Sequence, residues 1–137
     1  MAAHRASIPA FPFIPKSTRW LERGQFWALP LTDGRFGAGC VVGFHLAPEG
    51  ERSTRLFVAG VIDWIGEHAP ATSDLRGRSI VTFAFAHIKA ITTCGAMLGQ
   101  AEQLDYRGAP AEAEALSLPM WGYAMPGILA TRLIAAG

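Results

Sequence analysis

The chain has 137 residues, half of them hydrophobic and 17% charged, and its formal net charge at pH 7 is +1. That length is typical of one domain, and so much apolar side-chain surface excludes disorder over most of the chain. The near-neutral charge excludes a long-range field that would draw the protein to nucleic acid or to an anionic membrane. We therefore expect one globular domain over residues 1–137 that binds neither.

The first stretch, residues 1–19, carries Pro9, Pro12 and Pro15 between apolar and aromatic side chains. Proline fixes its own φ and restricts the residue before it, so this stretch predicts an extended arm and not a helix. We expect the arm to cover a sheet edge as a strap or, as the alternative, to dock a partner. The prolines do not fit a secretory signal, and no apolar run reaches the roughly 20 residues that span a bilayer. We therefore expect a cytoplasmic protein.

The next segment predicts a β-hairpin. Gln25–Leu31 is an apolar run of strand length, and Thr32–Arg35 follows it with an Asp-Gly pair that tolerates positive φ in a tight reversal. The return strand, Phe36–Phe44, alternates strictly, so every second side chain shares a face. One face carries Phe36, Ala38, Cys40, Val42 and Phe44, and the other carries Gly37, Gly39, Val41 and Gly43. Glycine weakens a strand, so three glycines on one face indicate that a bulky neighbour packs closely against it.

Three later segments complete the predicted sheet. Arg55–Trp64 is apolar on both faces over most of its length, which predicts an interior strand. Ile80–Ala86 alternates, and His87–Ile91 then breaks the alternation, as a bulge or a helical turn does. Cys94–Gly99 is a short apolar segment that contains glycines and predicts a closing strand.

After Gln100 the composition shifts to Ala, Glu and Pro, which predicts a C-terminal extension over residues 101–137. Short helices are expected at Ala111–Leu116, which follows a proline, and at Gly127–Ala136, where apolar residues recur near helical spacing. The predicted fold class is all-β. It is a small twisted antiparallel sheet, or a partly open barrel, of five to six strands with one or two short helices near the C-terminus.

The cysteines and histidines are the candidates for catalysis or metal binding. A Cys–His nucleophilic pair needs its two side chains within hydrogen-bond reach. Cys40 and His45 fall on opposite faces of one predicted strand, which leaves Cys94 and His87, and Cys94 has no sequence signature of a catalytic nucleophile. The chain also has no C-x-x-C or H-x-x-x-H spacing. We therefore expect no catalytic residue, no metal ligand and no cofactor, and we expect both cysteines to be reduced.

The hairpin segment Gly24–Val41 resembles the immunity protein 26 family of bacterial polymorphic toxin systems. That family has a pattern like G-[DQ]-h-[FW]-A-h-P-L-x-D-G-[RK]-[FY]-G-x-G-x-V, where h is apolar. The matching residues are Gly24, Phe26, Trp27, Ala28, Leu29, Pro30, Leu31, Asp33, Gly34, Arg35, Phe36, Gly37, Gly39 and Val41. Ile91–Gly99 is similar to the family's closing strand, although the tryptophan that the pattern places near Met97 is missing. The resemblance covers the expected β core, residues 20–100.

This resemblance implies a protein that neutralises a cognate bacterial toxin by direct, stoichiometric binding and needs no catalytic residue. Two other functions stay open from the residues alone: a small β-barrel-like module that binds a ligand or nucleic acid, and a small hydrolase. Salt-dependent affinity for DNA or RNA separates the first of these from a protein binder. Loss of an activity in the Cys94→Ala variant identifies the second.

Charged residues of both signs gather in two predicted connections, Ala47–Arg55 and Gly66–Arg78. The functional interpretation is a mixed-charge surface that sets the choice of partner, and the alternative is a solvated rim. The expected partner-binding residues are Glu49, Glu51, Arg52, Arg55, Glu67, Asp74, Arg76 and Arg78. Exposed loop substitutions usually change stability by less than about 0.5 kcal/mol. We therefore expect alanine at these positions to leave folding almost unchanged and to weaken binding strongly at one or two of them, with the others neutral.

Overall fold

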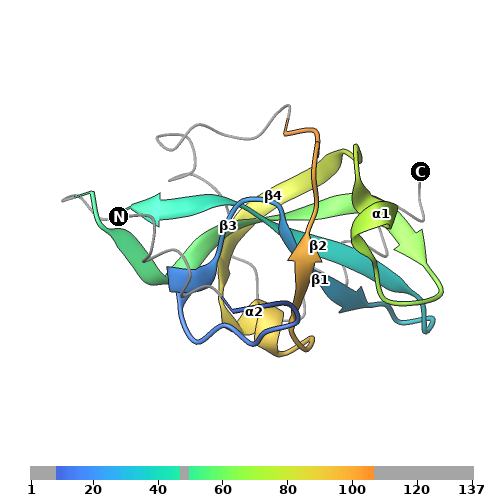
Figure 1. Cartoon of the computed structure of the whole chain (residues 1–137), viewed down its shortest axis with the longest axis horizontal. Coiled ribbons are helices and arrows are strands. Elements are labelled where there is room, and N and C mark those ends of the chain that lie inside the picture. Colours follow the sequence, from blue (N-terminus) through green and yellow to red (C-terminus); the bar gives the residue numbers. More distant parts are fainter. Residues whose placement is uncertain (1–8, 47–49, 107–137) are drawn as a thin grey trace.

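In the computed structural model, residues 9–46 and 50–106 are described, apart from the side chains of His45 and Leu46. Five strands form one antiparallel sheet that does not close into a barrel within these residues (Figure 1). The strands are β1 (Gln25–Pro30), β2 (Phe36–Leu46), β3 (Arg52–Gly66), β4 (Ile80–His87) and β5 (Met97–Gln100). They lie in the order β4-β3-β2-β1-β5. The predicted all-β fold of five to six strands is confirmed.

The helical elements are short and lie between the strands or before them. They are the 3₁₀-helix η2 (Thr18–Trp20), α1 (Thr72–Leu75) and α2 (Lys89–Thr92). α2 forms where the alternation breaks after β4, so the helical turn is the correct one of the two predicted options. The helices expected at Ala111–Leu116 and Gly127–Ala136 lie outside the described residues.

The tight reversal between β1 and β2 forms as the Asp-Gly pair predicts. Gly34 has a φ of +86°, in the left-handed region that favours glycine. The N–H of Leu31 donates to the carbonyl of Arg35 over 2.9 Å, which closes the turn. Asp33 pairs with the guanidinium of Arg35 at 2.7 Å, and the hydrogen bond from that guanidinium lowers the pKa of Asp33.

One face assignment in β2 is wrong, and a β-bulge is the reason. Val41 pairs with Ala59 of β3, but Gly43 pairs with Val58, so β2 has one residue more than β3 in this interval. An extra residue moves every later side chain to the other face of the sheet. Phe44 therefore packs in the same core cluster as Val41, and not with the even-numbered residues as strict alternation predicts.

One predicted strand boundary is also wrong. β3 begins at Arg52, three residues before the predicted start at Arg55, so Arg52 belongs to a strand and not to the connection that the polar sequence predicts. The reason is that β2 and β3 continue to pair as far as Leu46 and Arg52. Pairing through the backbone therefore extends β3 into its polar N-terminal residues.

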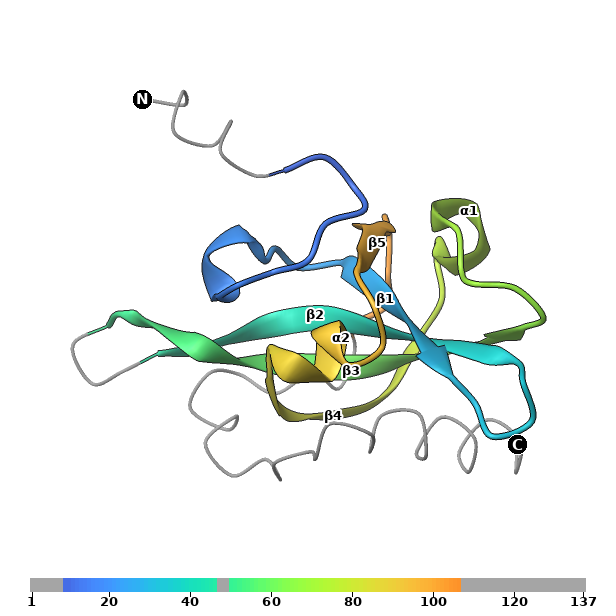
Figure 2. The ribbon, with the colours of Figure 1, turned by 90° about the horizontal axis from the view of Figure 1, so that it is seen from below.

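Both faces of the sheet carry a buried core. The first core cluster joins Phe13 and Leu21, which precede β1, to Ile91 of α2. The second core cluster includes Leu75 of α1 and Leu104, which follows β5. Alternating side chains of the strands divide between the two clusters, and the view in Figure 2 shows α1 and α2 beside the long strands. The chain therefore fills both sides of its own sheet.

The N-terminal arm covers the outer edge of β5, as the strap interpretation predicts. The backbone of Phe13 donates to the carbonyl of Met97 over 3.0 Å and accepts from the N–H of Met97 over 2.8 Å. The ring of Phe13 is buried and meets Trp20 edge-on, with 6.1 Å between ring centroids. This pairing satisfies backbone groups that an edge strand otherwise leaves open.

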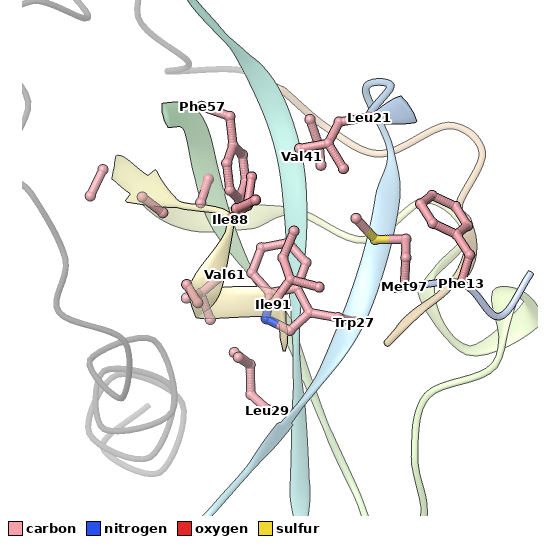
Figure 3. Packing of buried hydrophobic residues seen from close by; sticks show 14 of the residues in the cluster. Phe13, Leu21, Trp27, Leu29, Val41, Phe57, Val61, Ile88, Ile91 and Met97 are labelled. Atoms are coloured by element: carbon pink, nitrogen blue, oxygen red, sulfur yellow. The ribbon is translucent and has the colours of Figure 1, made fainter. Parts of the chain in front are cut away.

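Trp27 of β1 packs on the glycine face of β2. It pairs directly with Gly39, and a Cβ added to Gly39 would lie 2.6 Å from two atoms of the indole. Trp27 is fully buried, and its ring meets Phe57 of β3 edge-on with 5.9 Å between centroids. Figure 3 shows the indole within the first core cluster, near Val61 and Ile91. The bulky neighbour that the glycines indicate is therefore Trp27.

We expect Gly39→Val to lower the free energy of unfolding by about 1–3 kcal/mol, because valine overpacks against Trp27. Urea unfolding measures the change. Gly43→Val on the same strand is the matched control, since the nearest atom to an added Cβ there is 3.9 Å away and valine favours strands. An unchanged unfolding midpoint for Gly39→Val would contradict the close contact.

Candidate partner-binding surface

The two charged connections lie at opposite ends of the sheet. β3 joins them and has 15 residues, so at about 3.3 Å per residue its ends are about 45 Å apart. Figure 2 shows the end of β2 and the start of β3 at one end of the long strands and α1 at the other. A standard interface buries about 800 Å² per partner, a patch about 30 Å across. One such patch does not include both connections.

We name the two regions by their elements. The β2–β3 end contains Glu51, Arg52 and Arg55, and the α1 end contains Glu67, Asp74, Arg76 and Arg78. Glu49 lies outside the described residues. The structure therefore separates the predicted partner-binding residues that it describes into two groups.

At the β2–β3 end, Arg52 holds the segment that precedes β1. Its guanidinium lies over the ring of Phe44, 3.5 Å from the ring centroid. It also donates hydrogen bonds to the carbonyls of Thr18 at 3.3 Å and of Leu21 at 3.5 Å. Partial burial lowers the pKa of Arg52, but a guanidinium stays charged in proteins. The cation is therefore used for contacts within the chain.

Arg55 and Thr18 fasten the same segment to β3. The guanidinium of Arg55 donates to the carbonyl of Lys16 over 2.7 Å. The buried hydroxyl of Thr18 donates to the carbonyl of Ser53. Arg52 and Arg55 therefore clamp the arm to the sheet, which differs from the free loop side chains that the sequence predicts.

At the α1 end, Asp74 and Arg78 form hydrogen bonds with the backbone at the two ends of the short helix. The carboxylate of Asp74 accepts a hydrogen bond of 2.8 Å from the N–H of Ala71, just before α1. Arg78 donates to the carbonyls of Asp74 at 3.2 Å and of Asp63 at 3.3 Å. Both of these bonds end on neutral carbonyls, so the charge of the exposed Arg78 is not neutralised by them.

A hollow of about 530 Å³ lies beside α1 and is lined by Thr72, Ser73, Arg76 and Glu102. Arg76 is exposed, and its Nε donates to Oε1 of Gln103 over 3.1 Å. The hollow thus combines a cation, an anion and two hydroxyls. Sequence reasoning missed Glu102 and Gln103, because they follow β5 and lie outside both predicted connections.

Two acidic residues of the predicted connections, Glu51 and Glu67, are exposed, whereas Asp74 is half-buried. Glu67 lies near the β1–β2 turn, where Asp33 chiefly and Glu67 more weakly raise the pKa of Arg35. Glu51 is exposed at the β2–β3 end. The α1 end is therefore the region where exposed charges of both signs lie together with a hollow.

The two cysteines are free and belong to different core clusters. Complete burial raises the pKa of Cys40 to about 12, and burial also raises the pKa of Cys94. A reactive thiol needs the opposite shift. Nδ1 of His87 accepts a hydrogen bond of 3.1 Å from the N–H of Lys89, and burial lowers the pKa of His87. These surroundings do not activate either thiol as a nucleophile.

Within residues 9–46 and 50–106, no group of three or more His, Cys, Asp or Glu side chains is arranged to hold a metal ion. No helix in this part of the chain is long and apolar enough to cross a membrane. No protein-family model, curated protein or solved structure matches the chain. The resemblance of the hairpin to the immunity protein 26 family therefore stays a prediction.

We expect Arg52→Ala to lower the free energy of unfolding by about 0.5–1.5 kcal/mol, because it removes a cation–π contact and hydrogen bonds to two carbonyls. Urea unfolding of the purified variant measures the loss. Glu51→Ala is the matched control, since Glu51 is the exposed neighbour of Arg52. Equal stability of the two variants would show that Arg52 does not hold the arm.

Proposed function

We propose that this chain neutralises a bacterial protein toxin by binding it one to one, in the cytoplasm of the cell that makes the toxin. The observation that carries the proposal is the Gly24–Val41 motif, which resembles the immunity protein 26 family and forms the hairpin of β1 and β2. In this fold the residues of the motif have a structural role, since Trp27 packs on Gly39 and Gly34 forms the turn. Recognition is therefore assigned to exposed side chains outside the motif.

The α1 end is the contact surface that we favour. Its exposed charges have both signs, and such a surface complements a folded protein partner pair by pair. A net charge of +1 provides little of the general attraction on which binding to phosphate backbones depends. At the other end of the sheet, Arg52 and Arg55 are already bonded to the arm.

The test uses the full-length chain with an affinity tag, expressed in the bacterium that carries its gene. The lysate is treated with nuclease before capture. We expect the chain to retain one protein, and native mass spectrometry should find the two in a one-to-one complex. That protein should stop growth when it is expressed alone, and coexpression of the chain should restore growth.

The control variant is Cys94→Ala, because neutralisation by binding uses no thiol. It should protect cells as well as the wild-type chain does. Loss of protection by a folded Cys94→Ala variant would favour a hydrolase. Material that is retained from an untreated lysate but not from the nuclease-treated one would favour a nucleic-acid-binding module. A captured protein that is harmless alone would contradict toxin neutralisation.

A further inference from the structure

The hollow beside α1 has a polar lining that neither the hairpin motif nor the two core clusters explain. Its side chains are those of Arg76 and Glu102 with the hydroxyls of Thr72 and Ser73. We propose that it receives an acidic and a basic side chain from one loop of a protein partner, with the acid on Arg76 and the base on Glu102. This inference gives the proposed toxin binding a contact point, and it rests on that function.

The two walls of the hollow are fixed to each other by backbone hydrogen bonds. The N–H of Gly77 donates to the carbonyl of Glu102 over 3.3 Å, and the N–H of Asp105 donates to the carbonyl of Arg78 over 2.9 Å. Leu75 anchors α1 beneath them and is fully buried in the second core cluster. A site whose walls are already in place loses little conformational entropy when a partner binds.

Gln103 orients Arg76 without neutralising it. The backbone of Gln103 has a φ of +60°, in the left-handed region that residues other than glycine seldom adopt. Its amide oxygen accepts the 3.1 Å hydrogen bond from Nε of Arg76 and carries no charge. Arg76 forms no ion pair with a carboxylate in the described part of the chain. No carboxylate among the described residues occupies its terminal nitrogens, and a carboxylate is the group that a guanidinium fork matches best.

Glu102 determines which second side chain of a partner the hollow favours. An ionised carboxylate only accepts hydrogen bonds, so it favours a Lys or Arg side chain and repels phosphates or a run of acidic residues. The hydroxyls of Thr72 and Ser73 both donate and accept, so they suit either member of the pair. The volume of about 530 Å³ falls within the range of about 300–1,000 Å³ that ligand sites occupy. It has room for more than one side chain.

The experiment selects a phage-displayed library of disulfide-closed random peptides on the immobilised full-length chain. We expect enrichment of peptides in which Asp or Glu stands within two positions of Lys or Arg. These peptides should bind at least tenfold more weakly to Arg76→Glu and to Glu102→Lys. Arg19→Glu is the control: it makes the same change of charge at an exposed residue of η2, and it should bind as the wild type does.

Urea unfolding checks that each variant is folded, and Arg76→Gln replaces Arg76→Glu if the charge reversal prevents folding. Enriched peptides without an acid–base pair, or equal binding by the wild-type and Arg76 variants, would overturn the proposal. A captured toxin that binds Arg76→Glu and Glu102→Lys as tightly as the wild type would overturn it too, while the proposed function stands. The expected peptide binding without any captured toxin would support the hollow as a protein-binding site and count against toxin neutralisation.

Discussion

The packing of Trp27 on Gly39 is the contact on which the rest of the sheet depends. β1 lies between β2 and β5, and its consecutive aromatic residues belong to opposite core clusters. Trp27 occupies the space over Gly39 of β2, and Phe26 does the same over Gly99 of β5, where an added Cβ would lie 3.0 Å from the ring. The Nε1–H of Trp27 has no acceptor among the described residues, so burial and dispersion hold this ring in place.

This arrangement decides which side chains remain for recognition. The chain covers both faces of its sheet, and Phe13 pairs along the edge of β5. Arg52 and Arg55 bind the arm, since each donates a hydrogen bond to a carbonyl that precedes β1. The α1 end differs because Arg76 is held by a neutral amide and keeps an unpaired charge within the described residues. The proposed contact with a partner is therefore placed at the end of the molecule where a charge is oriented and no described residue neutralises it.

The sequence predicts structural features that are set by neighbouring residues. It misses features that depend on pairing between segments far apart in the chain. Alternation and the Asp-Gly pair predict the strands, and the weakness of glycine in a strand predicts a close neighbour for Gly39. Phe44 is assigned to the wrong face, because the bulge between Val41 and Gly43 arises from pairing with β3. The hollow is missed because Arg76 and Gln103, which are 27 residues apart, meet only through tertiary hydrogen bonds. No repeating pattern in the sequence indicates that these two side chains lie together.

A double-mutant cycle between Trp27 and Gly39 measures the central contact most directly. Trp27→Leu removes the indole atoms nearest to Gly39, so a valine at position 39 then meets less steric resistance. The free energies of unfolding of the wild type, Trp27→Leu, Gly39→Val and the double variant are measured in urea. We predict that the double variant loses at least about 0.5 kcal/mol less than the sum of the single losses, as expected for residues in contact. Losses that add to within about 0.3 kcal/mol, as at independent sites, would contradict the contact.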